Sequence, residues 1–415
     1  MSQLRRLLRI RDFRYLWVAQ VLSDFGDNLT FITLLILIQR LTGSTVALAG
    51  LMVSMALPTL VFGILAGVYV DRFDRKKAMI LSDLLRAVVV LCFLFVRSEE
   101  LVPVIFAIAF VQASIGTVFN PARNAFLPAA VGTDKLLAAN SVSQTSRIVF
   151  NLLGTAAAGV LAALGESLGP AFIVDSATFF GSFLLISRIR TSGISKKDGA
   201  ESKVWVDMKE GFRVMISSRP LRAVLIALSV TMLGLGAVNV LFVPFIIDDL
   251  MVSEAFLGAI EASQVAGLVI SGTLVAVSAS RLRPSHLVSI GLVTVGIFVG
   301  AISGADAVWQ VMVLLLLVGL SVGPVQAGAN TLSQTLIEDS LRGRVGGAVN
   351  TLISAANITS MGLAGVAAAA IGTRNVFLVS GSLVALSGLL AYWLFNDPRK
   401  RPYEPATVEP AAETP

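Results

Sequence analysis

Two aspartates lie deep in the first long apolar run of the chain, residues 14–38. Asp24 and Asp27 stand about 10 to 13 residues into the expected helix, or roughly 15–20 Å, which is near the centre of a bilayer. Their i, i+3 spacing puts both carboxyls on one face. A carboxyl pair in a medium of low dielectric constant can exchange protons near neutral pH, and it titrates as a coupled unit. The alternative is that one of them is permanently paired with Arg123 or Arg147 and only holds helices together.

A third acid, Glu261, lies in a later apolar run and shares a face with Gln264. An ionisable side chain inside a membrane is costly, so it is a functional candidate until it is explained. A proton or substrate role and a plain polar lining of the outer vestibule both fit this position. The candidates for proton coupling are therefore Asp24, Asp27 and Glu261.

The composition places the chain among membrane proteins. It is 55% hydrophobic and 14% charged, with a mean hydropathy of +0.83, whereas soluble domains carry about 25% charged residues. Cys92 and His286 are its only cysteine and histidine, which excludes an internal disulfide and leaves a metal site or a Ser-His-Asp triad almost without residues. We expect no metal and no cofactor. The net charge of +6 fits basic loops beside anionic membrane lipid, and we expect no nucleic acid partner.

Twelve apolar runs are long enough to cross a bilayer, which needs roughly 20 residues for each helix. The sequence thus predicts an all-α, multi-pass membrane protein. Lys and Arg are concentrated in alternate loops, which places both termini in the cytoplasm. With one helix more or fewer, the basic loops would no longer all lie on the same side of the membrane. The expected helices are 14–38, 46–70, 78–96, 102–126, 142–164, 170–188, 221–246, 256–279, 286–304, 307–332, 345–371 and 375–395.

A long polar and basic stretch separates six of these runs from the other six. Two such halves predict parallel repeats, which place a substrate between them near the membrane midplane. Within the stretch, residues 204–216 have the spacing of an amphipathic helix at the cytoplasmic interface. The predicted parts are an N-terminal six-helix half at 1–189, a cytoplasmic linker at 190–220, a C-terminal six-helix half at 221–396 and a disordered cytoplasmic tail at 397–415.

A very basic turn joins the second and third runs. The stretch Gly67 to Lys77 has the pattern Gly-x-x-x-Asp-Arg-x-x-Arg-Lys-Lys. It resembles the signature loop between helices 2 and 3 of the major facilitator superfamily, with Asp74 in place of a glycine. The resemblance implies a cytoplasmic gate with which an arginine of the fourth helix communicates. The other interpretation, membrane orientation and lipid contact alone, explains residues 75–77 but not the acidic Asp71. The gate residues are Gly67, Asp71, Arg72, Arg75, Lys76, Arg123 and Arg147.

Three further stretches, Phe13–Asp27, Asn120–Arg123 and Glu210–Arg222, resemble the enterobactin-exporter and macrolide-efflux branch of that superfamily. This resemblance implies a major facilitator fold, with two six-helix pseudo-repeats around a central cavity. It also implies export of small amphiphilic molecules (drug, macrolide or siderophore-like) by a monomer in the inner plasma membrane, with protons or sodium as the coupling ion. Because the sixth helix of this superfamily usually faces away from the cavity, Asp175 is assigned a structural role.

Alternative functions remain open. The stretch Ala19–Asn28 also resembles lysophospholipid transporters, so a lipid transporter or flippase is the second hypothesis. A non-transporting sensor is disfavoured because it would need neither the gate nor the buried carboxyls. No Gly-x-x-x-x-Gly-Lys loop is present, which argues against an ATP-driven chain, and an enzyme is least favoured.

One small-residue stretch, Gly154–Gly159, resembles a degraded antiporter motif, Gly-Pro-x-x-Gly-Gly, in which Thr155 replaces the proline. Small residues permit close helix contact, and Gly362–Gly365 is a potential partner in the other half.

Polar amides with scattered aromatic and methionine side chains fit an amphiphilic solute in the central cavity. No ring of intramembrane cations is present, which argues against a polyanion. Any one of these amides can equally form a hydrogen bond between helices. The cavity candidates are Asn28, Gln112, Asn151, Asn239, Phe242, Gln264, Gln326, Asn330 and Asn357.

Overall fold

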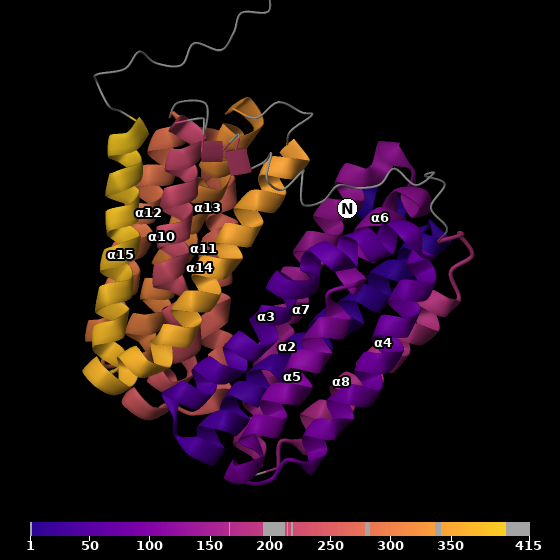
Figure 1. Cartoon of the computed structure of the whole chain (residues 1–415), viewed down its shortest axis with the longest axis horizontal. Coiled ribbons are helices and arrows are strands. Elements are labelled where there is room, and N and C mark those ends of the chain that lie inside the picture. The colour runs from indigo at the N-terminus through magenta and orange to yellow at the C-terminus, as the bar shows by residue number, and fades with distance from the viewer. Residues whose placement is uncertain are drawn as a thin grey trace, which may run out of the picture.

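The computed structural model describes residues 2–165, 167–193, 212–213, 215–216, 219–278, 283–336 and 342–395. Within these residues, twelve helical segments are long and apolar enough to cross a membrane, which confirms the all-α, twelve-span prediction. They form two bundles that meet at one end and diverge toward the other (Figure 1). The exact boundaries of the predicted domains stay a prediction, and the tail at 397–415 lies outside the described residues.

The first bundle, here called the N-terminal half, runs to Ser187. Its fourth span is not the single helix predicted at 102–126, because α5 ends at Gly116 and α6 begins at Phe119. Pro121 has no N–H to donate to the Thr117 carbonyl, so the helix is interrupted there. The helices are α1 (Ser2–Leu8), α2 (Arg11–Thr42), α3 (Thr45–Arg72), α4 (Arg75–Leu91), η1 (Cys92–Phe95), η2 (Glu99–Leu101), α5 (Val102–Gly116), α6 (Phe119–Val131), η3 (Thr133–Lys135), α7 (Leu136–Leu164) and α8 (Gly169–Ser187).

The second bundle, the C-terminal half, begins at Arg219. Of the amphipathic helix predicted at 204–216, the structure describes 212–213 and 215–216, which are helical, and Met215 is buried against Leu221 and Val345. The helices are α10 (Arg219–Pro244), η4 (Phe245–Asp249, a π-helical turn), η5 (Glu254–Phe256), α11 (Leu257–Ser278), α12 (Pro284–Ala301), η6 (Ile302–Gly304), α13 (Val308–Leu336), α14 (Arg342–Ile371) and α15 (Thr373–Phe395).

Asp74 has a local role that explains its place in the basic turn. It is the N-cap of α4, and its Oδ1 accepts hydrogen bonds from the backbone N–H groups of Lys76 (2.9 Å) and Lys77 (3.2 Å). A helix start leaves such N–H groups without intrahelical partners, and an N-cap aspartate satisfies them. The acid that stands in place of the glycine therefore begins the third membrane span.

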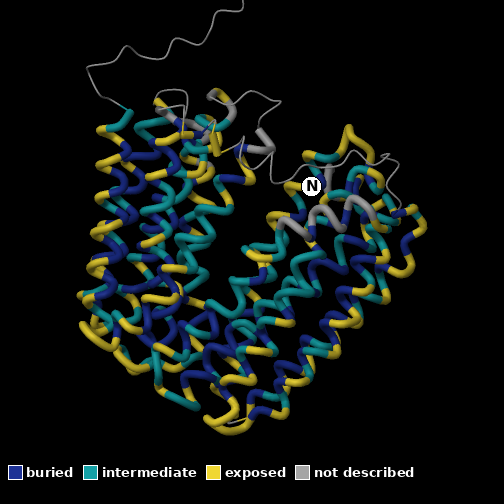
Figure 2. The backbone as a smooth tube through the Cα atoms, viewed as in Figure 1, coloured by how far each residue is buried: buried dark blue, intermediate teal, exposed yellow. Residues whose placement is uncertain are grey.

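The two halves share a hydrophobic core at one end only. One buried cluster joins Leu35 and Met52 of the N-terminal half to Leu241 and Ile260 of the C-terminal half. Toward the ends at which α1 and α10 begin, buried apolar residues form separate clusters within each half. Figure 2 shows the same asymmetry, with buried backbone continuous between the bundles at one end. We call these the closed end and the open end.

Small residues allow the halves to approach at the closed end. A Cβ added at Gly365 in α14 would lie 2.6 Å from the Thr45 carbonyl oxygen at the start of α3. A Cβ added at Gly258 in α11 would lie 2.6 Å from the Cα of Ala156 in α7. The suggested pairing of Gly362–Gly365 with the run 154–159 is therefore wrong, since Gly365 packs on α3 and Ala156 packs on α11.

Candidate functional site

Asp27 of α2 forms an ion pair with Arg86, which lies in α4 of the same half. The Arg86 side chain is 9% exposed, whereas the Asp27 side chain is 43% exposed. The guanidinium carbon of Arg86 also lies 4.1 Å from the centre of the Phe179 ring in α8, a cation–π contact. Arg86 therefore joins three helices, and it offers a buried charge to a carboxyl that solvent can reach.

Asp24 has a different and looser partner. Its Oδ1 lies 3.8 Å from Nε of Arg147 in α7, and its Oδ2 accepts a hydrogen bond from Gln20 at 3.2 Å. Arg147 in turn donates to the Asn120 side chain in α6 at 3.2 Å. The two aspartates thus pair with opposite neighbours, Asp27 with α4 and Asp24 with α7. The sequence alternatives included Arg147 for one of the two, and they did not include Arg86.

Two more carboxyls are fully buried in this half. Asp83, one turn before Arg86, accepts a hydrogen bond from Ser182 of α8 at 2.5 Å. Asp175 of α8 accepts from Thr30 of α2 at 2.6 Å. The structural role expected for Asp175 fits this contact. Asp83 and Arg86 were missed, although two ionisable residues at i, i+3 within an apolar run are the signal that identified Asp24 and Asp27.

Gly26 allows α8 to come this close to α2. A Cβ added at Gly26 would lie 2.1 Å from Thr178 Oγ1 and 2.2 Å from Asp175 Oδ1. Any larger residue would separate the helices and break the hydrogen bond from Thr30 to Asp175. The glycine between Asp24 and Asp27 therefore sets the helix spacing on which the buried polar cluster depends.

Apart from Arg147, which pairs with Asp24 inside the bundle, the predicted gate residues lie at the open end. Arg75 donates to the Ala125 carbonyl of α6 at 2.8 Å, and Lys76 donates to the carbonyls of Ser187 and Ile189 at 3.1 and 2.7 Å. Arg123 is buried and donates to the neighbouring Asn124 side chain at 2.7 Å. These contacts tie together helix ends of the N-terminal half. The side chains of Gly67, Asp71 and Arg72 lie outside those that the structure describes, and the gate remains a prediction.

Glu261 is linked to the N-terminal half through Thr155. The amide of Asn28 in α2 donates to Thr155 Oγ1 in α7 at 2.5 Å and to the Asn151 carbonyl at 2.6 Å. The Thr155 hydroxyl is hydrogen-bonded to the Glu261 carboxylate of α11. A polar chain therefore crosses from α2 through α7 to the other half, and it passes through the threonine that stands at the proline position of the antiporter motif.

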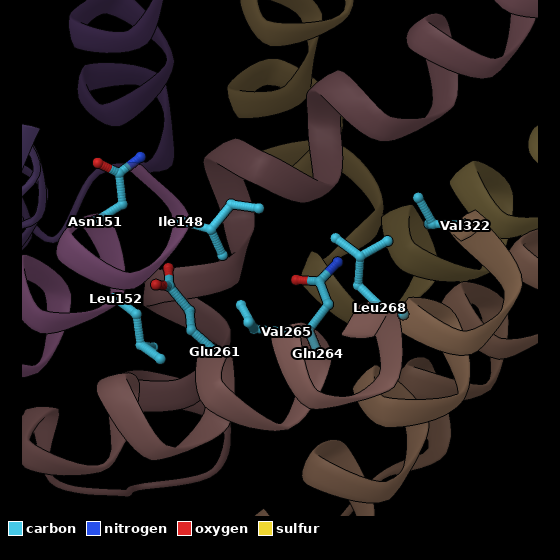
Figure 3. A pocket seen from close by; sticks show the side chains of 9 residues that line it. Ile148, Asn151, Leu152, Glu261, Gln264, Val265, Leu268 and Val322 are labelled. Atoms are coloured by element: carbon cyan, nitrogen blue, oxygen red, sulfur yellow. The ribbon is translucent and has the colours of Figure 1, made fainter. Parts of the chain in front are cut away.

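A cavity of about 260 Å³ opens beside this chain. Figure 3 shows Asn151 and Leu152 on one side and Glu261, Gln264 and Leu268 on the other. The walls come from α7, α11 and α13, so both halves line it. The cavity combines a carboxylate and two amides with aliphatic side chains, which are the groups that bind an amphiphilic solute.

The remaining cavity candidates do not form one cluster with this pocket. Gln112 in α5 is buried, and Phe242 packs against the core at the closed end. Asn357 in α14 donates to the sulfur of Met361 at 3.9 Å. Asn239, Gln326 and Asn330 are exposed on α10 and α13. Of the nine candidates, Asn151 and Gln264 are the two that line the pocket, and Asn28 serves as a bond between helices.

The closed end is held by polar pairs between the halves. Arg40, near the end of α2, bonds Glu254 of η5 at 3.0 Å. Its neighbour Gln39 donates to Asp248 of η4. Thr45 Oγ1 donates to the Gly365 carbonyl of α14 at 3.1 Å. Any separation of the two halves at this end must break these contacts.

Comparison with known proteins gives a consistent result. A family model described as "Transmembrane secretion effector" matches residues 6–406. Macrolide efflux protein A of Streptococcus pyogenes is 28% identical over 397 residues, 94% of this chain and 96% of its own length. Multidrug efflux pump Tap of Mycolicibacterium fortuitum is 29% identical over 397 residues, 91% of this chain and 94% of its own. The crystal structure of a bacterial homologue of the iron transporter ferroportin, in an inward-facing state, shares the fold with a TM-score of 0.74 and 17% identity, over 94% of this chain and 99% of that one.

Proposed function

The chain belongs to the transmembrane secretion effector family of the major facilitator superfamily, and we propose on that premise that it exports small amphiphilic molecules by alternating access and proton antiport. The substrate class is drug, macrolide or siderophore-like. The named relatives that support this class are a macrolide efflux protein and a multidrug efflux pump. The protein acts as a monomer in the inner membrane, with both termini in the cytoplasm, and it performs no catalysis.

The observation that carries the proposal is the pairing of Asp27 with the buried Arg86. A proton on Asp27 cancels the attraction between the two side chains and lets α2 move relative to α4. Loss of the proton restores the pair. Because the Asp27 side chain is 43% exposed, protons can reach it without opening the helix bundle. Binding or loss of a proton at Asp27 would then move α2 relative to α4.

The motion of α2 has a path to the substrate pocket. Asn28 follows Asp27 directly and is bonded to Thr155, which is bonded to Glu261 at the pocket wall. Asp24 with Arg147 connects the same helix to α7. A substrate that enters from the open end and binds between α7, α11 and α13 therefore lies one polar chain away from the proposed proton carrier. Rocking of the two halves then breaks the pairs of the closed end and releases the substrate there.

The test is transport in proteoliposomes that contain the full chain, with a macrolide or a lipophilic cation and with or without a pH gradient. The variants are Asp27→Asn and Asp24→Asn, and Asp134→Asn in the exposed loop between α6 and α7 is the matched control. We expect Asp27→Asn to lose uphill flux at least tenfold while it still binds substrate, and Asp24→Asn to lose less.

Two outcomes would overturn parts of this proposal. Wild-type flux that ignores the pH gradient would remove proton antiport, and a sodium gradient would then be imposed in the same vesicles. Lysophospholipid flux in the absence of drug flux would instead establish the second hypothesis, a lipid transporter of the same fold.

A further inference from the structure

A second cavity, of about 830 Å³, lies at the closed end within the N-terminal half. Its lining residues come from the end of α2, from η1 and the residues after it, and from the start of α8. The walls are mostly apolar and include Leu41, Phe93 and Phe172. No residue of the first pocket lines it, so it is a separate site.

Two arginines, Arg40 and Arg97, are the charged side chains among the described residues that line this cavity. The charge pattern of the sequence makes both unusual. The charge bias of the sequence assigns both to the outer side, where the other cation expected is Arg374 and where the acidic pair Asp248 and Asp249 also lies. Because Lys and Arg are generally retained on the opposite, cytoplasmic side, two arginines beside one apolar cavity need an explanation.

The two arginines are bonded to different degrees. Arg40 donates to the Ala162 carbonyl at 2.8 Å and to Glu254 at 3.0 Å. Arg97 donates through Nε to the Leu94 carbonyl at 3.4 Å, and it has no acidic partner among the described residues. Its charge is thus available to a ligand. The N-terminus of α8, which carries a weak partial positive charge, also borders the cavity, and its N-cap residue Leu168 makes no side-chain capping bond.

We propose that this cavity binds the phosphate of an anionic phospholipid from the adjacent leaflet. A guanidinium matches two phosphate oxygens in geometry and charge. An acyl chain would lie along apolar side chains that face outward at the cavity rim, where Phe95 is 79% and Ile173 is 54% exposed. Both residues belong to segments long and apolar enough to cross a membrane, so the rim of the cavity faces acyl chains, which favours a lipid over a free phosphate ion.

The site has a consequence for the closed end. Arg40 lines the cavity and also forms the bond to Glu254 between the two halves. A lipid phosphate beside Arg40 competes with Glu254 for the same guanidinium. Anionic lipid would therefore weaken one of the contacts that hold the halves together at this end.

The experiment measures lipid binding to the purified full chain by native mass spectrometry. Phosphatidylglycerol and phosphatidylcholine with identical acyl chains are titrated separately. We expect wild type to prefer phosphatidylglycerol, and Arg97→Gln to weaken that binding about fivefold, the effect of about 1 kcal/mol for one cation near anionic lipid. Arg97→Lys keeps most of the affinity. Arg374→Gln is the matched control, because Arg374 pairs with Asp306 in the C-terminal half, and it leaves the binding unchanged.

A second variant tests the cavity itself. Ser167→Trp places a large side chain at its wall, and we expect it to exclude phosphatidylglycerol without a change in thermal unfolding of the lipid-free protein. Equal binding of the two lipids, or equal loss in Arg97→Gln and Arg374→Gln, would overturn the site. Displacement of phosphatidylglycerol by inorganic phosphate at comparable concentration would show a free-anion site and would overturn the lipid assignment.

Discussion

The two halves of the molecule are built from the same number of spanning helices and hold them together in different ways. In the N-terminal half, buried charges connect helices, as Arg86 does between Asp27 of α2 and Phe179 of α8. In the C-terminal half, glycine and serine bring helix backbones into direct contact. A Cβ added at Gly296 of α12 would lie 2.2 Å from the Ala385 backbone nitrogen of α15.

Other C-terminal contacts follow the same pattern. Thr231 and Ser387 form a hydrogen bond of 2.8 Å between α10 and α15, and a Cβ at Gly388 would lie 2.7 Å from the Ser289 carbonyl. Among the described residues of this half, Glu261 is the carboxylate inside a spanning helix beyond its terminal turns. Under the proposed mechanism this difference becomes a division of roles: the N-terminal half contains the groups that respond to protons, and the C-terminal half is the rigid body against which it moves.

The largest expected effect is that of Arg86→Leu. The substitution leaves the carboxyl of Asp27 without its cation and removes the contact with Phe179. Breaking a buried ion pair costs about 3–5 kcal/mol, and we expect about 3 because Asp27 is 43% exposed. Chemical unfolding in detergent measures this loss, and proteoliposome transport should lose its response to the pH gradient.

Arg147→Leu is the matched comparison for that prediction. Arg147 is 35% exposed and lies 3.8 Å from Asp24, a geometry in which a pair contributes about 1 kcal/mol or less. If Arg86→Leu and Arg147→Leu cost the same stability and both keep gradient-driven transport, the N-terminal charges are structural. The division of roles would then be wrong.

Much of the fold follows from the sequence because apolar run length and charge bias respond to the same bilayer. Twelve spans are present within the described residues, and Asp74 explains the start of one of them. The interruption between α5 and α6 coincides with Pro121, but Pro58 and Pro324 lie inside the continuous helices α3 and α13, so a proline in the sequence does not by itself predict a break.

The site was harder to predict, because the sequence does not show which residues of other helices contact a given side chain. Asp24 and Asp27 are close in sequence, and yet one pairs with α7 and the other with α4. The choice depends on the rotation of α2 and on Gly26, which fixes the distance to α8. Arg86 stands between the apolar residues 84–85 and 87–88, so the high mean hydropathy of the span masks its charge.

A smaller effect tests the C-terminal half. Gly296→Ala puts a methyl group against the α15 backbone, where only movement of a whole helix can make room, and we expect a loss of about 2 kcal/mol in stability. Gly272→Ala is the control on α11, since a Cβ there meets nothing within 4 Å. It should gain about 0.5–1 kcal/mol from helix propensity. Thermal unfolding of both variants gives the difference, and equal effects would contradict backbone contact as the source of rigidity in this half.

The smallest expected effect concerns the place where the two kinds of packing meet. Thr155 is bonded to Asn28 on one side and to Glu261 on the other, so it joins the polar network of the N-terminal half to an acid of the C-terminal half. Thr155→Val keeps the shape and removes the hydroxyl. We expect it to cost about 1 kcal/mol in stability and to reduce transport a few-fold, while Thr155→Ser restores both.

Glu261→Gln separates the two possible meanings of that result. An amide at this position can still form a hydrogen bond with Thr155. If the bond between Thr155 and Glu261 only holds the helices together, transport should survive the substitution. If transport depends on the negative charge of Glu261, transport should be lost. Transport in vesicles with and without a pH gradient distinguishes them. If Thr155→Val leaves transport intact while Glu261→Gln abolishes it, Glu261 acts on the substrate independently of α2, and the C-terminal half is more than a rigid partner.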